Sequence, residues 1–240
     1  MTAIEILKQA QGMRLEDEDG QVGELRLLPG LSEQELKDLE ARLPCPLPDE
    51  AREVLSCCRG LEGILESVDF AGLEGGFGME EIFPHAIAIA HDGFGNYWIV
   101  DLTSESTSWG PIFFACHDAP VIVFQTDSFA HFISEILRLG NPPWQSEIDE
   151  VHESHQSRIW RDNPGTMTHE QCLNSGDPDL AAFARSLDET YLFIDLRNAK
   201  TGGGFSWGRY GPQTINKRFG EKRIFAYQVR KPFWQRLFRK

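Results

Sequence analysis

One stretch of the chain, residues 91–102, constrains the fold more than any other. It begins with Asp92, Gly93, Gly95 and Asn96, four turn-forming residues within five positions. Glycine tolerates positive φ, and Asp and Asn bond their own backbone. The following run, 97–102, is aromatic and β-branched and carries only one charge. A run that is apolar at odd and even positions alike is typical of a strand buried on both faces. The stretch therefore predicts a turn that leads into a central strand of a sheet.

Amphipathic helices are predicted on both sides of this stretch. Ser32 followed by Glu35 forms a capping box that starts a helix over 31–43, and a second helix is expected from Pro48 to a C-terminal cap at Gly60. Ser128 caps a third helix over 129–139. We further expect a helix at 2–12, short strands at 25–28, 112–116 and 121–124, and a glycine-rich acidic loop at 61–78.

The order of these segments resembles the SMI1/KNR4 (SUKH) family, which groups bacterial immunity proteins with fungal cell-wall regulators. The residues that carry the resemblance are Leu31–Leu47, Asp92–Asn96, Asp101–Leu102, Gly110–Pro111, His117–Asp118 and Ser128–Phe129. The resemblance covers about residues 25–140 and implies an α+β domain with a mixed or antiparallel sheet flanked by helices. It also implies a non-enzymatic protein that binds other proteins and uses no cofactor.

The chain divides unevenly by charge. Residues 1–150 contain 28 Asp/Glu and 8 Lys/Arg, whereas residues 151–240 contain 9 Asp/Glu and 15 Lys/Arg. An acidic body repels nucleic acid and attracts basic partners. The alternative is that the acidic charge only confers solubility. Five cysteines without a paired spacing are typical of a reducing cytosol. No apolar run is long enough to span a membrane, and no secretion signal is evident.

We divide the chain into an N-terminal extension (1–24), the SUKH-like domain (25–145) and a smaller C-terminal α/β extension (146–240). In the extension, a helix is expected from Asp177 and strands at 190–197 and 223–229. Residues 217–240 contain nine Lys/Arg against Glu221 alone. This basic end is predicted to dock on the acidic body of its own chain or of a second copy. Binding to nucleic acid or to an anionic membrane surface is the alternative.

Several short motifs resemble catalytic or metal sites. Gly204–Gly208 has the Gly-x-Ser-x-Gly spacing of esterases, but every histidine precedes Ser206, so a strand segment is the better interpretation. His152 and His155 with Asp149 have one residue too few for a zinc-protease helix, so a solvated helix face is the better interpretation. Gly72–Gly78 lacks the lysine of a phosphate loop. The pairs at 91–92 and 117–118 have no nucleophile predicted beside them. We assign no catalytic or metal-binding residue.

The predicted function follows from the resemblance and the charge. We expect a cytoplasmic immunity protein that binds a cognate, basic toxin and occludes its active site. The alternative is a regulatory scaffold that binds several cellular partners. The candidate partner-binding residues are Glu74, Glu80, Glu81, Asp92, Phe94, Asn96, Trp98, Asp101, Trp109 and Asp118. For each of them a purely structural role, in a turn, a strand end or the core, is the alternative interpretation.

Overall fold

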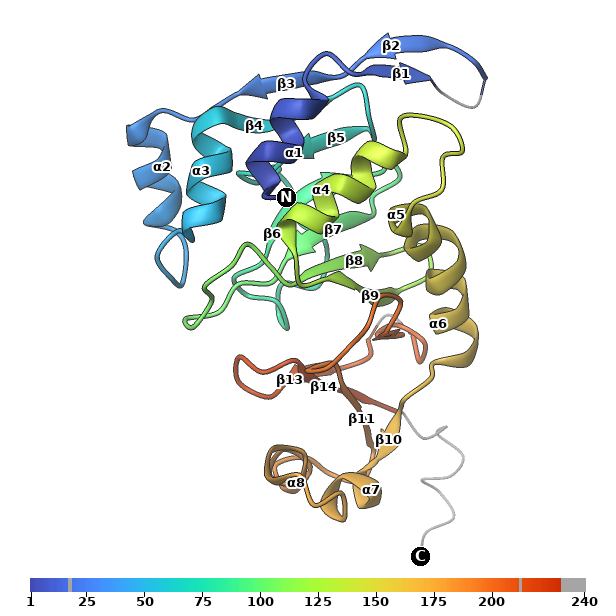
Figure 1. Cartoon of the computed structure of the whole chain (residues 1–240). Coiled ribbons are helices and arrows are strands. Elements are labelled where there is room, and N and C mark those ends of the chain that lie inside the picture. The colour runs from blue at the N-terminus through green and yellow to red at the C-terminus, as the bar shows by residue number, and fades with distance from the viewer. Residues whose placement is uncertain (17–18, 212, 230–240) are drawn as a thin grey trace, which may run out of the picture.

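The computed structural model describes residues 1–16, 19–211 and 213–229, and its centre is an eight-stranded antiparallel sheet (Figure 1). We call it the main sheet, and its strand order is β12-β9-β8-β7-β6-β5-β4-β3. The strands are β3 (Arg26–Pro29), β4 (Cys58–Glu62), β5 (Ser67–Asp69), β6 (Ile87–His91), β7 (Tyr97–Val100), β8 (Ile112–Cys116), β9 (Val121–Thr126) and β12 (Gly204–Phe205).

Strand β7 occupies the interior of the main sheet, as its sequence predicted. It pairs antiparallel with β6 on one side and with β8 on the other. Trp98, Ile99 and Val100 are buried, with Trp98 and Val100 in the core on one face and Ile99 in the core on the other. A strand buried on both faces needs apolar residues at consecutive positions, which explains the absence of polar alternation.

Helices cover one face of the main sheet (Figure 1). They are α1 (Ala3–Ala10), α2 (Glu33–Glu40), α3 (Asp49–Cys57) and α4 (Phe129–Arg138). Thr2 and Ser32 each close a capping box, and Ser128 caps α4, so local sequence fixes where these helices begin. The amphipathic α1 packs between α3 and α4. No helix of the described residues is both long and apolar enough to cross a membrane.

The chain after α4 continues along the same face. Helices α5 (Glu147–Asp149) and α6 (Gln156–Asp162) flank a π-helical segment, η1 (Glu150–His155). Val151 and Ile159 join the same core as α1 and α4. A separate two-stranded ribbon, β1 (Arg14–Glu16) with β2 (Val22–Glu24), lies next to the chain that follows α4.

A second sheet covers part of the other face (Figure 1). Its strand order is β10-β11-β14-β13, with β10 (Met167–Thr168), β11 (Tyr191–Asp195), β13 (Asn216–Arg218) and β14 (Ile224–Gln228), and helices α7 (His169–Leu173) and α8 (Pro178–Arg185) pack behind it. Phe225 and Tyr227 of this sheet share one apolar core with Ile99, Phe113 and Phe124 of the main sheet. The C-terminal part of the chain thus both adds β12 to the main sheet and builds a sheet of its own.

Some predicted elements were wrong in detail. The second helix ends at Cys57 rather than at Gly60, which lies in β4. A β-carbon at Gly60 would lie 2.0 Å from the carbonyl oxygen of Val68, so the close approach of β5 requires glycine in this strand. The predicted loop at 61–78 contains β5, and β10, β13 and α7 were not predicted. These elements are short, and tertiary pairing rather than local propensity forms them.

Candidate partner-binding site

The main sheet has two ends, and the chain reverses differently at each. At the end that we call the turn end, the short connections 63–66, 92–96 and 117–120 lie near one another because their strands are neighbours or near neighbours. At the opposite end, which we call the loop end, lie the longer connection 101–111 and the entry into α4 at 127–128.

Asp92 organises the 92–96 turn. Its Oδ1 accepts hydrogen bonds from the backbone N–H of Phe94 (2.8 Å) and of Asn96 (3.2 Å), and its Oδ2 accepts one from Asn96 Nδ2 (2.6 Å). Gly93 and Gly95 take φ angles of 83° and 88°, which glycine adopts without strain. Side-chain bonds therefore fix this turn, as its composition predicted.

Phe94 lies at the tip of the turn, with 76% of its surface exposed. Below it, the buried Asn96 accepts a hydrogen bond on Oδ1 from the backbone N–H of His117 (3.0 Å), which ties the 92–96 turn to the 117–120 turn. An aromatic ring on a pre-organised backbone loses little entropy when it is bound. Such rings are typical anchors of protein interfaces.

His152 of η1 contacts the same turn. Its Nε2 donates to Asp92 Oδ2 (3.0 Å), and its ring lies over Trp98 with the centroids 6.1 Å apart. Burial alone would raise the pKa of Asp92. Hydrogen bonds from Asn96, His152 and the backbone of Phe94 outweigh burial, so the pKa of Asp92 lies below its usual value. The carboxylate is therefore ionised at neutral pH.

Three exposed carboxylates, Glu66, Asp118 and Glu153, surround the turn. Glu66 lies against it, since a β-carbon added to Gly93 would come within 3.2 Å of the Glu66 side chain. Among the described residues, Asp118 and Glu153 form ion pairs only with histidines, with N to O distances of 3.3 Å and 2.8 Å. Within the described ranges, no Lys or Arg forms an ion pair with these three residues or with Asp92.

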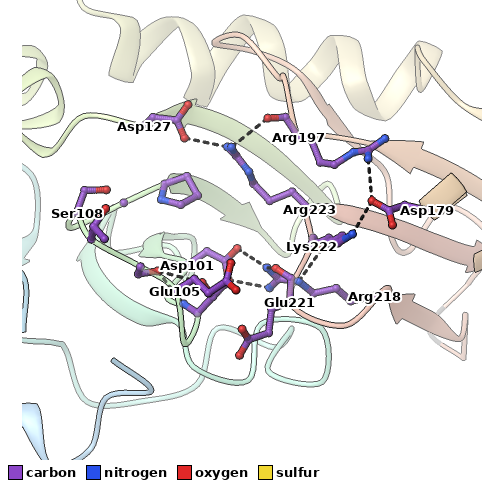
Figure 2. A pocket seen from close by; sticks show the side chains of 15 residues that line it. Asp101, Glu105, Ser108, Asp127, Asp179, Arg197, Arg218, Glu221, Lys222 and Arg223 are labelled. Carbon is purple, nitrogen blue, oxygen red and sulfur yellow. Dashed lines mark hydrogen bonds and ion pairs between the residues drawn. The ribbon is translucent and has the colours of Figure 1, made fainter. Parts of the chain in front are cut away.

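Two carboxylates of the loop end, Asp101 and Asp127, are neutralised by the C-terminal part of the chain (Figure 2). Arg218 of β13 donates to both oxygens of Asp101, at 2.7 Å and 2.8 Å, and the side chains are 6% and 1% exposed. Burial raises the pKa of Asp101, and the hydrogen bonds from Arg218 act against that rise. Arg223 pairs with Asp127 at 2.8 Å. Arg218 and Arg223, at the start of the basic end, thus contact the acidic body of their own chain. Residues 230–240 lie outside the described chain, and docking of the whole basic end stays a prediction.

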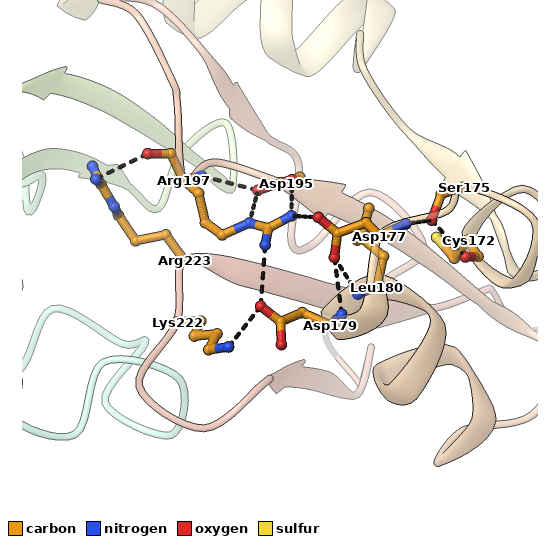
Figure 3. Close-up of polar contacts among 9 residues, drawn as sticks. All are labelled: Cys172, Ser175, Asp177, Asp179, Leu180, Asp195, Arg197, Lys222 and Arg223. Carbon is orange, nitrogen blue, oxygen red and sulfur yellow. Dashed lines mark hydrogen bonds and ion pairs between the residues drawn. The ribbon is translucent and has the colours of Figure 1, made fainter.

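A polar pocket of about 500 Å³ remains between the 101–111 loop and this basic hairpin. Its cations already have anionic partners. Arg197 donates to Asp177 (2.6 Å), Asp179 (3.2 Å) and Asp195 (2.6 Å), and Lys222 donates to Asp179 (2.6 Å) (Figure 3). The guanidinium and ammonium groups of this cluster are therefore paired with carboxylates, and they are not free to attract an anion into the pocket.

The acidic loop before β6 forms a separate surface. Glu74, Glu80 and Glu81 are exposed. Glu80 also holds the loop together, because its Oε1 accepts from the backbone N–H of Phe77 (2.8 Å) and of Gly78 (3.2 Å). A pocket of about 440 Å³ lies between this loop and the end of α2, with Glu74 and Glu80 among its lining residues.

The structure divides the predicted partner-binding residues into two groups. Those with exposed side chains are Glu74, Glu80, Glu81, Phe94 and Asp118, whereas the Asp92 side chain is only 7% exposed and its oxygens accept hydrogen bonds from within the chain. Those that are buried are Asn96, Trp98, Asp101 and Trp109, and their assignment to a contact surface is corrected here because core packing or internal ion pairing occupies them. Sequence reasoning missed Glu66 and Glu153, and it interpreted His152 as part of a solvated helix face. The pattern of residues 147–155 carries no signal for the contact with Asp92, 60 positions earlier.

The motifs weighed as chemical sites have structural roles in this fold. Ser206 is fully buried, its backbone N–H donates to Asn163 Oδ1 (2.9 Å), and its hydroxyl lies 3.4 Å from the Pro120 carbonyl oxygen. A serine in this position cannot reach a substrate from solvent. No group of three or more His, Cys, Asp or Glu within the described residues is arranged to hold a metal ion.

Comparison with known proteins identifies part of the chain. Residues 30–135 match the SMI1 / KNR4 family (SUKH-1). No curated protein and no solved structure matches the chain. The matched segment runs from just before α2 into α4, so it contains the turn end together with Asp101 and Asp127. The arginines that neutralise those two carboxylates come from outside the matched segment.

Proposed function

Residues 30–135 form a domain of the SMI1/KNR4 family (SUKH-1), and on this premise we propose that the chain binds a basic protein partner through its turn end. The α+β fold with an antiparallel sheet agrees with the fold that the resemblance to this family implies. The family suggests protein partners and groups immunity proteins with regulators. The partner that we propose is a toxin, which the protein neutralises by covering its active site.

The observation that carries the proposal is the combination of an exposed aromatic ring with unneutralised carboxylates. Phe94 supplies the apolar anchor, while Glu66, Asp118 and Glu153 surround it without a pairing Lys or Arg among the described residues. A fixed apolar centre with a charged rim is the arrangement that protein interfaces use. Negative charge at the rim speeds association with a positive surface and disfavours acidic partners.

A basic toxin would find its complement here rather than at Asp101 and Asp127, which Arg218 and Arg223 already neutralise. Enzymes that act on nucleic acid present a positively charged cleft, and a carboxylate-rich surface can occupy such a cleft in place of the substrate. Inhibition by this route is stoichiometric and requires no bond to be made or broken. We place the protein in the cytoplasm of the cell that it protects, and we assign it no enzymatic step.

The experiment uses the toxin domain encoded beside the gene, co-expressed in a sensitive bacterial host and purified for calorimetry. We expect growth to be rescued, a 1:1 complex, and loss of both with Phe94→Ala. Glu170→Gln, which removes an exposed carboxylate from α7, is the matched control and leaves binding unchanged. A toxin that neither binds nor is neutralised would remove this function. Affinity capture that yields many weak partners would favour a regulatory scaffold instead.

A further inference from the structure

A series of stacked aromatic rings runs from the core between the two sheets to the surface. Phe205 of β12 stacks with Phe225 and with Tyr227 of β14, at centroid distances of 5.2 Å and 6.1 Å. Tyr210 stacks on Tyr227 at 6.0 Å, with the two ring planes 19° apart. The first three rings are fully buried, whereas Tyr210 is 39% exposed. Tyr210 therefore ends the series, and Tyr227 is its only aromatic partner among the described residues.

Three arginines gather where this series reaches the surface, and we call Arg158, Arg161 and Arg209 the arginine cluster. They lie around a single carboxylate, that of Asp162. The hydrogen bond from Arg161 chiefly lowers the pKa of Asp162, and the charges of Arg158 and Arg209 lower it further. Within the described ranges, the only ion pair of the cluster is that of Arg161 with Asp162. Three cations therefore share one carboxylate, and positive charge is left over.

Arg158 and Arg209 are held in place without being neutralised. Arg209 donates through Nη1 to the carbonyl oxygen of Trp160, and Arg158 donates through Nη2 to that of Gly202 at 2.9 Å. A guanidinium carries five N–H donors, so most of them remain for a ligand. Both side chains are exposed. Each of these arginines is thus tied to the protein at one point and still able to bind an anion.

The ring series and the arginine cluster meet at the C-terminal end of α6. The hydroxyl of Tyr227 accepts a hydrogen bond from Nδ2 of Asn163 (2.6 Å), and Asn163 ends α6 in a left-handed conformation. Tyr210 follows Arg209 directly in the chain. Trp160, in the last turn of α6, adds a second exposed ring, with 38% of its surface accessible. One surface therefore presents two aromatic rings beside unneutralised cations.

This combination selects a ligand that carries both flat rings and anions. Guanidinium groups bind phosphate in a bidentate geometry, and exposed aromatic rings stack on nucleobases. The carboxylates of an acidic protein would satisfy the arginines but would bring no ring to Tyr210. A nucleic-acid duplex keeps its bases stacked inside, whereas a single strand presents a free base and a phosphate at every step. A single strand therefore engages Tyr210, Trp160 and the arginines together.

We propose that the end of α6 and the adjoining segment 206–210 bind single-stranded nucleic acid. One base stacks on Tyr210, and Arg158 and Arg209 bind the neighbouring phosphates. This inference goes beyond the proposed function and does not depend on it, because the site lies outside the family segment 30–135 and belongs to the C-terminal part of the chain rather than to the acidic body.

The test uses the full chain and a fluorescein-labelled deoxythymidine decamer, with fluorescence anisotropy at low salt. We expect a dissociation constant below about 100 μM. An abasic decamer has the same phosphates and should bind about tenfold more weakly, because no base stacks. A glutamate decapeptide and free thymidine monophosphate should compete poorly. Equal binding of the abasic strand would overturn the proposal, as would effective competition by the peptide, which indicates an acidic protein, or by the mononucleotide, which indicates a free nucleotide.

Variants of the arginines locate the phosphate contacts. The double variant Arg158→Gln with Arg209→Gln should weaken the decamer at least about tenfold. The slope of the logarithm of affinity against the logarithm of salt concentration should fall by about 1.4, since each lost contact to a single strand removes about 0.7. Arg185→Gln removes an exposed arginine from α8 and is the matched control, with unchanged binding. An unchanged affinity in the double variant would assign the strand to another basic segment and overturn the proposal.

Variants of Tyr210 test the stacked base. Tyr210→Leu keeps an apolar contact with Tyr227 but removes the ring plane, and it should weaken the decamer about tenfold. Tyr210→Phe keeps the ring and should bind like the parent protein. Phe94→Ala changes a different surface and should leave strand binding unaffected. The thermal midpoint of each variant shows whether it is folded. Equal affinities of Tyr210→Leu and Tyr210→Phe would contradict a stacked base at this position.

Discussion

The two ends of the main sheet both carry carboxylates, but they handle the charge differently. At the loop end, Asp101 and Asp127 pair with Arg218 and Arg223, which arrive from the C-terminal sheet. At the turn end, the exposed Asp118 and Glu153 pair with histidines and with no Lys or Arg of the described residues. The same kind of side chain therefore joins parts of the chain at one end and remains available to a partner at the other. Charge that is already paired inside the molecule is weak evidence for a binding surface.

The sharpest test of the loop end is Arg218→Met. Removal of the guanidinium leaves Asp101 buried without a partner, and such a change costs about 3–5 kcal/mol of unfolding free energy. Urea denaturation of the parent and variant at pH 7 measures this loss. The double variant Arg218→Met with Asp101→Leu should recover much of it, since no charge is then left buried. A loss below about 1 kcal/mol in the single variant would mean that Asp101 is not ionised or is solvated there.

At the turn end, Phe94→Ala should leave the stability nearly unchanged and weaken partner binding. The ring is 76% exposed, so the unfolding free energy should change by less than about 0.5 kcal/mol. Removal of a central aromatic anchor should weaken partner binding by about 2 kcal/mol or more. Calorimetric titration and urea denaturation on the same samples measure both quantities. A variant that loses stability and keeps affinity would assign the ring to packing.

The rim carboxylates should affect association more than stability. In the triple variant Glu66→Gln, Asp118→Asn and Glu153→Gln, we expect the association rate to fall about tenfold at low salt, and the difference to shrink as salt is added. The stability should be unchanged or slightly higher, because neighbouring negative charges repel one another. Stopped-flow kinetics with the toxin at several salt concentrations provide the measurement. An unchanged rate at low salt would exclude electrostatic steering by this rim.

The smallest expected effect is that of Asp92→Asn on stability, about 1 kcal/mol at pH 7. The pKa of Asp92 is lower in the folded protein than in the unfolded chain, so the ionised carboxylate stabilises the fold. That contribution is fully present above about pH 4, the usual pKa of aspartate, and is lost as the pH falls through the lower folded value. Urea denaturation of both proteins from pH 7 downward should show the difference shrinking in acid. A difference that grows in acid would mean that the protonated form of Asp92, and not the ionised form, stabilises the fold.

Local patterns in the sequence predicted much of the fold. The capping boxes and apolar spacing located α2 and α4, and Asp177 followed by Pro178 located the start of α8. The composition of residues 92–102 predicted both the turn and the interior strand. These features depend on neighbours a few positions away, so the sequence displays them directly. Short elements such as β5, β10 and β13 have too few residues for such a signal.

The candidate site was predicted less completely, for a physical reason. The sequence placed Asp92, Phe94 and Asp101 in one functional group because they lie close together along the chain. Strand β7 carries Asp101 to the opposite end of the sheet from Phe94, where Arg218 covers it. Glu153 reaches the turn end only because η1 packs beside β7 and β8. Distances across the sheet cannot be read from spacing along the chain.

The sequence by itself therefore determined where the longer helices and the interior strand lie, where the Asp92 turn lies, and that the N-terminal two thirds are acidic. Only the tertiary structure decided which carboxylates stay free. An ion pair such as Asp101 with Arg218 joins residues 117 positions apart, and it forms because sheet packing brings them together. Local backbone and capping bonds are encoded by adjacent residues, whereas the neutralisation of charge depends on where the whole chain places its distant parts.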